Sequence, residues 1–276
     1  MQTDSRNDSK ENTVRLIQIT DPHLYSNPES TLLGMNTRES FDRVLEMIAR
    51  QHQEKKIDLV VATGDISQDA SEQSYQYFAS AVEHLAPFYW LPGNHDERRI
   101  MVTLPKHKAA FQNRIVCNNW QILMLDTSVT ETVHGYLVED ELQRLEQQLS
   151  HLDDGVEHTI VCMHHNPLQG SAVWMQEIGL TNADALLDVI KRHGSSVRAL
   201  VHGHVHQELD VLHDGIRVIA TPSTCIQFKP DVEDFTLDLL PPAYRWFDLH
   251  EDGSISTAVE RLKNYVVNVD TSAEGY

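Results

Sequence analysis

The chain has 276 residues, of which 41% are apolar, and a formal net charge of −19. Such an acidic balance argues against a protein that binds duplex DNA and favours solubility. No uninterrupted apolar run reaches the length of a membrane span, so we expect no membrane insertion. The three cysteines show no C-x-x-C spacing, which, together with a polar N-terminus, predicts reduced thiols in a cytoplasmic protein.

Strand and helix signals alternate along the first hundred residues. Residues 1–13 are polar and predict a disordered tail. Beyond them, short apolar runs predict strands, and apolar residues three and four positions apart predict helices between those strands. The expected order is a strand at 14–20, a helix at 37–53, a strand at 57–63, a helix at 70–85 and a strand at 88–92.

The remainder of the chain continues this alternation. Asn118-Asn119 predicts a hairpin over residues 115–126, and Asp252-Gly253 predicts a turn between antiparallel strands. The other expected elements are a helix at 139–150, a strand at 158–163, a helix at 182–193, and strands at 197–202, 210–220, 244–249 and 254–262. The pattern is typical of one layered α/β domain, assigned to residues 14–263, with a C-terminal tail at 264–276.

Five polar motifs stand at the points where predicted strands end. Each follows a short apolar run, so the motifs predict one site assembled from several strand ends. In chain order they are Asp21-Pro22-His23, Gly64-Asp65, Gly93-Asn94-His95-Asp96, His164-His165 and Gly203-His204-Val205-His206.

The residue types in these motifs indicate a metal site. Carboxylate, imidazole and amide groups without a thiolate suit divalent transition metals. Asp21 and His23, like His204 and His206, are two positions apart, and we expect extended backbone to point each pair to the same side. The glycines before Asp65, Asn94 and His204 would let the chain approach the metals closely. Seven ligands are too many for one ion: Asp21, His23, Asp65, Asn94, one of His164 and His165, His204 and His206.

The combination of motifs resembles the calcineurin-like metallophosphoesterase family, whose signature reads D-x-H, G-D, G-N-H-D/E, H and G-H-x-H. The resemblance implies a four-layer αββα sandwich, in which two mixed β-sheets are flanked by helices. It also implies two metal ions bridged by Asp65. Metal 1 would take Asp21, His23, Asp65 and His206, and metal 2 would take Asp65, Asn94, His164 and His204. His164 is chosen over His165 because Asn166-Pro167 follows, as a turn often does in the family.

The similarity extends to one branch of this family, the bacterial class III 3′,5′-cyclic AMP phosphodiesterases. Segments outside the metal motifs carry it, among them Leu33–Thr37, Ala220–Pro230 and the terminus Ser272–Tyr276. This resemblance implies hydrolysis of cyclic AMP to 5′-AMP by a hydroxide held between two divalent ions, with Fe(II) or Mn(II) favoured. The expected partner is a small cyclic nucleotide, not a nucleic acid or a membrane, and the oligomeric state is left open.

Roles within the site follow from the same resemblance. His95 would protonate the leaving oxygen or bind the phosphate, and Asp65 is grouped with it as catalytic because it bridges the metals. Asp96 would orient the His95 ring or serve as a turn residue. The expected substrate-binding set is His23, Asp65, Asn94, His95 and His206.

Several alternatives are left open by the sequence. Another hydrolase of the same fold would act on phosphoproteins, nucleotide esters, lipid-linked pyrophosphate or nucleic-acid ends, and a non-catalytic scaffold would bind proteins. The segment Thr221–Phe228 is either part of a nucleotide pocket or a packed turn with Phe228 in the core. Gln68 stands where many relatives carry an aspartate, three residues after the bridging Asp65.

Overall fold

The structure is a computed structural model that describes residues 12–104, 108–170, 172–193 and 195–275. The tail expected at residues 1–13 therefore lies outside the described residues, except for Asn12 and Thr13. Regular structure begins immediately after these two residues, at Val14.

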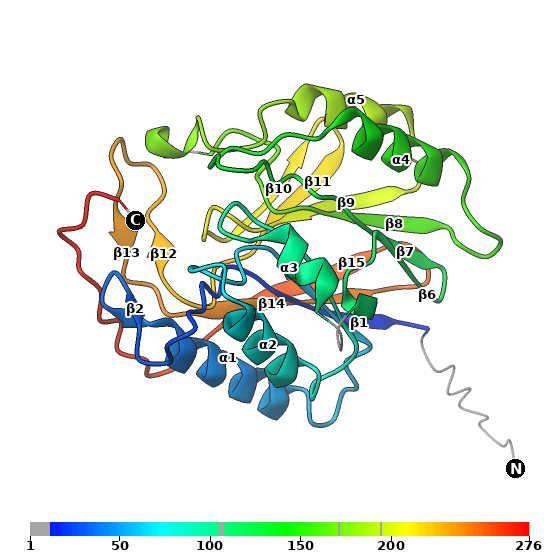
Figure 1. The fold of residues 1–276 in the computed structure, drawn as a ribbon. Helices are drawn as coiled ribbons and strands as arrows, with labels where there is room; N and C mark the ends of the chain where they lie inside the picture. The colour runs from blue at the N-terminus through cyan, green and yellow to red at the C-terminus, as the bar shows by residue number, and fades with distance from the viewer. Residues whose placement is uncertain (1–11, 105–107, 171, 194, 276) are drawn as a thin grey trace, which may run out of the picture.

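The first sheet has the strand order β15-β14-β1-β4-β5. The strands β1, β4 and β5 are parallel to one another, whereas β14 and β15 are antiparallel to their neighbours. Two helices cover the outer face of this sheet (Figure 1). The elements are β1 (Val14–Ile19), β4 (Leu59–Thr63), β5 (Phe88–Leu91), β14 (Ala243–Leu249), β15 (Ile255–Arg261), α1 (Thr37–Gln51) and α2 (Glu72–Val82).

The second sheet has the order β10-β11-β9-β8-β7-β6 and packs its inner face on the first sheet. Strands β7, β8, β9 and β11 are parallel, and β6 and β10 are antiparallel at the two edges. Helices α4 and α5 lie on its outer face (Figure 1). The elements are β6 (Arg114–Cys117), β7 (Trp120–Met124), β8 (His158–Cys162), β9 (Val197–His202), β10 (Leu209–His213), β11 (Ile216–Ala220), α4 (Glu139–Ser150) and α5 (Ala183–Arg192). The expected four-layer αββα sandwich with two mixed sheets is confirmed.

Short elements complete the fold. They are β2 (Thr31–Leu32), β3 (Met35–Asn36), β12 (Gln227–Phe228), β13 (Leu237–Asp238), α3 (Arg98–Thr103) and the 3₁₀ turns η1 (Lys108–Ala110) and η2 (Val173–Met175). None of them was expected from the sequence, because segments of two to six residues show too little periodicity to be recognised.

Alternation along the central strands explains why both faces of each sheet are buried. In β1, Leu16 belongs to the core between the two sheets, and Ile17 belongs to the core beneath α1 and α2. In β8, Ile160 faces the first sheet, and Val161 packs under α4 and α5. Successive side chains of a strand point to opposite faces, so a continuous apolar run serves two cores.

The expected strand at residues 210–220 is wrong. The structure forms two strands there, β10 and β11, which pair antiparallel with His213 opposite Ile216. Asp214 and Gly215 make the turn, with φ angles of 50° and 83°. Asp214-Gly215 is a strong hairpin signal that already marks this turn in the sequence. The other predicted strands and helices are confirmed to within a few residues at their ends.

Candidate metal centre

All seven expected ligands lie at one edge of the sandwich, in loops that follow strands. Asp21 and His23 follow β1, Asp65 follows β4, and Asn94 follows β5 in the first sheet. From the second sheet, His164 follows β8, and His204 and His206 follow β9. Parallel strands end at the same edge, so the two sheets deliver their loops to one place.

The first group of ligand atoms surrounds Nε2 of His206. This atom lies 3.2 Å from Nε2 of His23 and 3.4 Å from Oδ1 of Asp21. Nε2 of His23 is in turn 3.7 Å from Oδ2 of Asp65. These are the residues expected for metal 1, and all four side chains are buried.

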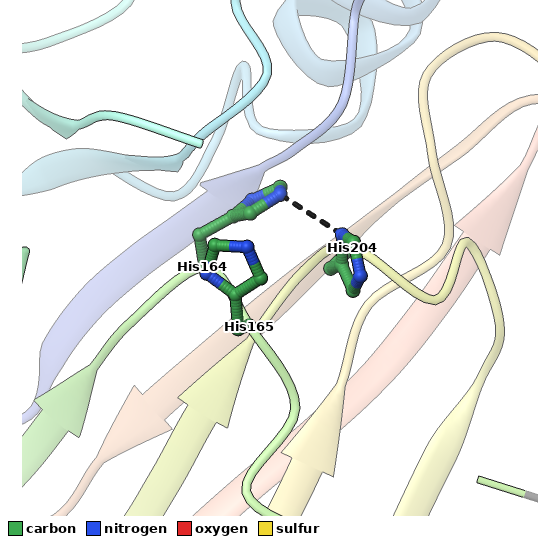
Figure 2. Close-up of side chains that lie close together, drawn as sticks. All are labelled: His164, His165 and His204. Atoms are coloured by element: carbon green, nitrogen blue, oxygen red, sulfur yellow. Dashed lines mark hydrogen bonds between the residues drawn. The ribbon is translucent and has the colours of Figure 1, made fainter. Parts of the chain in front are cut away.

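The second group surrounds Nε2 of His164. It lies 3.2 Å from Oδ1 of Asn94, 3.2 Å from Nδ1 of His204 and 3.3 Å from Oδ2 of Asp65. Figure 2 shows His164 and His204 facing each other beyond their strands. The structure therefore brings together the residues expected for metal 2 as well.

Asp65 stands between the two groups. Its Oδ1 accepts a hydrogen bond from the backbone N–H of His95 at 2.9 Å. Its Oδ2 is buried and faces both His23 and His164. An ion about 2.0–2.2 Å from each ligand atom holds neighbouring ligands roughly 3.0–3.6 Å apart. The spacings of 3.2–3.4 Å lie within this range, and the 3.7 Å between His23 and Asp65 lies just above it, so each group can accommodate one such ion with Asp65 shared.

The contacts favour His164 over His165 as the ligand. The ring of His165 packs beside those of His164 and His204, with centroids 4.9 and 4.8 Å away (Figure 2). Its Nδ1, however, is 2.8 Å from the hydroxyl of Thr127, on the side of the second sheet. The contacts with Asn94 and Asp65 described above are made by His164, so we read His165 as a neighbour of the centre.

Three of the candidate histidines are held by neutral oxygen acceptors. Nδ1 of His164 faces the carbonyl of Thr63 at 2.8 Å, and Nδ1 of His206 faces the carbonyl of Ile226 at 2.9 Å. Nδ1 of His23 faces Oε1 of Gln68 at 2.5 Å. A hydrogen bond donated by Nδ1 leaves the Nε2 lone pair directed at the centre, which is the arrangement that a metal requires.

The backbone at the ligands is not extended, and that expectation is wrong. The φ angles are 52° at Asp21, 46° at His23, 50° at Asp65, 67° at His204 and 48° at His206. Left-handed backbone is uncommon for residues other than glycine and costs on the order of 1–3 kcal/mol per residue. Hydrogen bonds between loops hold it, since Asp21 and His23 donate their N–H groups to the carbonyls of Gly64 and Asp65. The fold maintains a strained loop geometry in order to aim these side chains.

The glycines of the motifs stand where no side chain fits. A Cβ at Gly93 would lie 2.1 Å from Oδ1 of Asp65, and one at Gly64 would lie 2.4 Å from Nδ1 of His164. At Gly203 it would lie 2.1 Å from the hydroxyl of Thr20. The backbone at these glycines therefore lies directly against the candidate ligands Asp65 and His164 and against Thr20, as a close approach to the metals requires.

Burial and charge set the protonation of the ligands. Burial lowers the pKa of His23 to about 3 and that of His204 well below its usual range, so both rings are neutral. Burial also lowers the pKa of His164, but the Asp65 and Asp21 carboxylates outweigh it and raise the pKa to about 9. The ring of His164 is thus protonated on both nitrogens in the metal-free centre. A bound cation would replace the proton on Nε2.

His95 lies at the rim of the centre and is partly exposed. Its ring meets the ring of His23 edge-on, with centroids 5.0 Å apart. The carboxylate of Asp96 accepts hydrogen bonds from the N–H groups of Ile66, Ser67 and Gly93. These contacts favour the turn role for Asp96, because they tie the loop after β4 to the loop after β5.

The segment Thr221–Phe228 packs against Asp21 and His206 of the first group of ligands. The Ser223 hydroxyl donates to the carbonyl of Asp21, and the buried Phe228 ring stacks on His206 with centroids 4.3 Å apart. The Gln227 amide donates to the carbonyls of Ser223 and Cys225. The geometry therefore favours a packed turn over a nucleotide pocket.

A buried polar network under the site was missed in the sequence. The amide of Gln18 in β1 donates to the carbonyl of His202 in β9, and its Oε1 accepts from the Thr221 hydroxyl. Arg245 of β14 donates to the same hydroxyl and to the carbonyl of Ala220. The available signal was Gln18 as the single polar residue within the apolar run 16–19, because a buried amide needs partners.

The amino-acid sequence matches the family described as Calcineurin-like phosphoesterase over residues 14–208. The chain belongs to the calcineurin-like phosphoesterase family. Among its relatives, the 3′,5′-cyclic adenosine monophosphate phosphodiesterase CpdA of Escherichia coli is 43% identical over 95% of each chain. The protein of the same name from Pseudomonas aeruginosa is 40% identical over 96% of each chain. A 3′,5′-cyclic-nucleotide phosphodiesterase from Nostoc is 32% identical over 90% of this chain and 92% of its own.

Two solved structures share the fold. A dimetal phosphatase from Danio rerio superposes with a TM-score of 0.64 at 17% identity and covers 91% of this chain and 99% of its own. A purple acid phosphatase from yellow lupin gives the same TM-score at 12% identity, over 93% of this chain and 53% of its own. Within the described residues, no helix has both the length and the apolar character needed to cross a membrane.

Proposed function

We propose that this chain hydrolyses 3′,5′-cyclic AMP to 5′-AMP at a centre of two divalent metal ions. The observation that supports the proposal is Asp65, whose buried Oδ2 lies 3.7 Å from Nε2 of His23 in one group of ligand atoms and 3.3 Å from Nε2 of His164 in the other. Metal 1 is assigned to Asp21, His23, Asp65 and His206, and metal 2 to Asp65, Asn94, His164 and His204. The choice of substrate is supported by relatives named as cyclic AMP phosphodiesterases that match nearly the whole chain.

The bound ions would supply Lewis acidity and lower the pKa of a coordinated water, so that hydroxide is available near neutral pH. The residues of the chain set the charge of the site. Asp21 and Asp65 neutralise two of the four positive charges that two divalent ions bring. The three ring nitrogens that face away from the ions meet neutral oxygens. The centre therefore stays locally positive in an acidic protein and attracts the phosphodiester anion.

His95 is assigned the proton transfer to the leaving O3′. It is partly exposed at the rim, and its backbone N–H donates to Asp65 at 2.9 Å, which supports a position of the ring beside the bound phosphate. An imidazole at this place can donate a proton to the oxygen that departs or bind the phosphate. The substrate-binding set proposed with it is His23, Asp65, Asn94 and His206.

The nature of the ions and the location of the enzyme belong to the same proposal. Oxygen and imidazole ligands without sulfur suit Mn(II) or Fe(II). Cys117, Cys162 and Cys225 are unpaired in the structure, which fits a reducing compartment, and we place the enzyme in the cytoplasm.

A panel of substrates tests the proposal. The metal-loaded protein is assayed with cyclic AMP, cyclic GMP, 2′,3′-cyclic AMP, a nitrophenyl phosphodiester and a nitrophenyl phosphomonoester, with Asp65→Asn as the inactive control. We expect kcat/KM for cyclic AMP to exceed that for each other phosphate ester. Hydrolysis of the phosphomonoester alone would contradict the proposal and indicate a phosphatase of the same fold.

A further inference from the structure

The residue three positions after Asp65 is an amide, Gln68, and its side chain contacts a candidate metal ligand. Oε1 of Gln68 lies 2.5 Å from Nδ1 of His23. The opposite ring atom, Nε2, faces His206 at 3.2 Å and Asp65 at 3.7 Å. Gln68 and the proposed metal 1 thus lie on opposite sides of one imidazole ring.

Backbone hydrogen bonds fix the position of Gln68 relative to His23. The loop after β1 and the loop after β4 run side by side, with Leu24 bridged to Ser67. Gln68 donates its N–H to the carbonyl of Leu24 at 2.8 Å, and Leu24 donates to the carbonyl of Ile66 at 3.0 Å. His23 donates to the carbonyl of Asp65 in the same ladder. This pairing fixes the Cα atoms of His23 and Gln68 relative to each other.

The amide oxygen of Gln68 faces Nδ1 of His23, and this arrangement assigns the hydrogen of the neutral ring to Nδ1. An amide oxygen only accepts hydrogen bonds, so Nδ1 must be protonated and donate to it. In a neutral imidazole, Nε2 then keeps its lone pair, which points into the centre. With the opposite tautomer, the amide would have to turn its NH2 group toward Nδ1, and an N–H of the ring would point at the metal position.

Gln68 differs in kind from the groups that hold the other rings. His164 and His206 are held by the backbone carbonyls of Thr63 and Ile226, which every residue type supplies. His23 alone among these three rings is held by a side chain. Its orientation therefore depends on the identity of one residue.

The acid next to Gln68 serves another purpose. Oδ2 of Asp69 accepts from the N–H and the hydroxyl of Ser26, and Oδ1 accepts from the Ser67 hydroxyl and the N–H of Ser71. Asp69 thus ties the loops together at the surface and has its oxygens engaged there. The carboxylate of Asp69 therefore does not make the contact with His23 that Gln68 makes.

We propose that Gln68 is the positioning residue of metal 1: its amide oxygen holds His23 in the tautomer and orientation that bind the ion. The inference rests on the proposed dinuclear site. Loss of such a supporting group lowers metal affinity by about 10- to 100-fold in comparable sites. Because Gln68 contacts neither His164 nor His204 in the hydrogen-bond network described above, the loss is confined to one of the two ions.

Binding of Mn(II) to the metal-free protein tests this inference. The titration is followed by electron paramagnetic resonance of free Mn(II). His204→Ala, which is expected to lose metal 2, serves as the background in which metal 1 is observed alone. Gln68→Met keeps the length of the side chain and removes the acceptor, whereas Gln68→Glu keeps an acceptor. Gln207→Met is the matched control, since Gln207 follows the ligand His206 but its amide contacts the sulfur of Met175.

We expect Gln68→Met to weaken Mn(II) binding at metal 1 by about 10- to 100-fold. Gln68→Glu and Gln207→Met should bind within a few-fold of the parent, and all variants should keep the melting temperature of the metal-free protein. Unchanged affinity in Gln68→Met overturns the inference. A purely structural role would give a different result when Gln68→Met is made in the otherwise wild-type chain. The melting temperature would fall and both ions would bind more weakly to the same extent, and this outcome also overturns the inference. If His23→Ala still binds two ions as tightly as the wild type, the proposed dinuclear site itself fails.

Discussion

Nε2 of His23 and Nε2 of His206 lie 3.2 Å apart, although 183 residues separate them in the sequence. His23 follows β1 of the first sheet and His206 follows β9 of the second. The contact therefore forms only when the two sheets are packed face to face, as the core residues Leu16 and Val201 pack them. Ions bound at these residues would therefore couple to the packing of the two sheets and stabilise the sandwich.

Removal of the shared carboxylate should affect both ions. Asp65→Ala takes away the group that faces His23 and His164, so we expect fewer than two ions at full occupancy. His206→Ala should mainly weaken metal 1 and His204→Ala mainly metal 2, because each ring contacts only one group. Elemental analysis after dialysis measures the stoichiometry. Two ions retained by Asp65→Ala would show that another residue bridges them.

Replacement of His95 should separate the chemistry from the binding of metal. His95→Ala should keep both ions, since the contact with Asp65 is made by the backbone N–H. Turnover of cyclic AMP should fall by about 10²–10⁴, the usual range for a general acid. Steady-state kinetics on cyclic AMP and on a nitrophenyl phosphodiester measure the effect.

The leaving group distinguishes the two roles considered for His95. A nitrophenolate departs without protonation, so a missing general acid should matter less for the aryl substrate than for cyclic AMP. If the two substrates lose the same factor, His95 acts as a phosphate anchor instead.

Most of the fold and the composition of the site could be predicted from the sequence because both depend on side-chain type. The alternation of Leu16 and Ile17 between two cores is visible as an apolar run, and strand ends are marked by Gly-Asp, Gly-Asn and Gly-His pairs. Once those strands are parallel, their ends must meet. The grouping of the seven candidate ligands follows from this geometry.

Other features of the site have no signature in side-chain type. The carbonyls of Thr63 and Ile226 that hold His164 and His206 exist at every residue, so no motif marks them. The left-handed backbone at Asp21 and His204 follows from hydrogen bonds between loops that are distant in sequence. Local propensity favours the opposite conformation there, and tertiary contacts override it.

A methyl group at Gly93 should disrupt the centre. The Cβ of Gly93→Ala would lie 2.1 Å from Oδ1 of Asp65, so Asp65 or the loop must move. We expect Mn(II) affinity to fall at least about tenfold, in line with the effect of misplacing a ligand. Gly170→Ala is the control, because nothing lies within 4 Å of its Cβ position. Equal affinities in the two variants would show that the loop adjusts without cost.

The role of Phe228 can be decided by its effect on stability. The ring is buried, stacks on His206 and meets Trp174 edge-on at 5.2 Å between centroids. Phe228→Ala should reduce the free energy of unfolding by about 3–5 kcal/mol, the usual cost of deleting a buried phenyl ring. It should also weaken metal 1, because the His206 ring loses the surface against which it packs.

Two measurements on Phe228→Ala separate a packing role from a nucleotide pocket. Chemical denaturation of the metal-free protein gives the stability, and kinetics on cyclic AMP and a nitrophenyl phosphodiester give the activity. A packing role lowers stability and reduces activity on both substrates.

Leu239→Ala is the control. This side chain follows β13 and is 61% exposed, so its loss should change the stability by less than about 0.5 kcal/mol. Unchanged stability with a higher Michaelis constant for cyclic AMP alone would instead place Phe228 in the pocket. Since the ring is only 1% exposed and one face of it is covered by His206, we expect the first outcome.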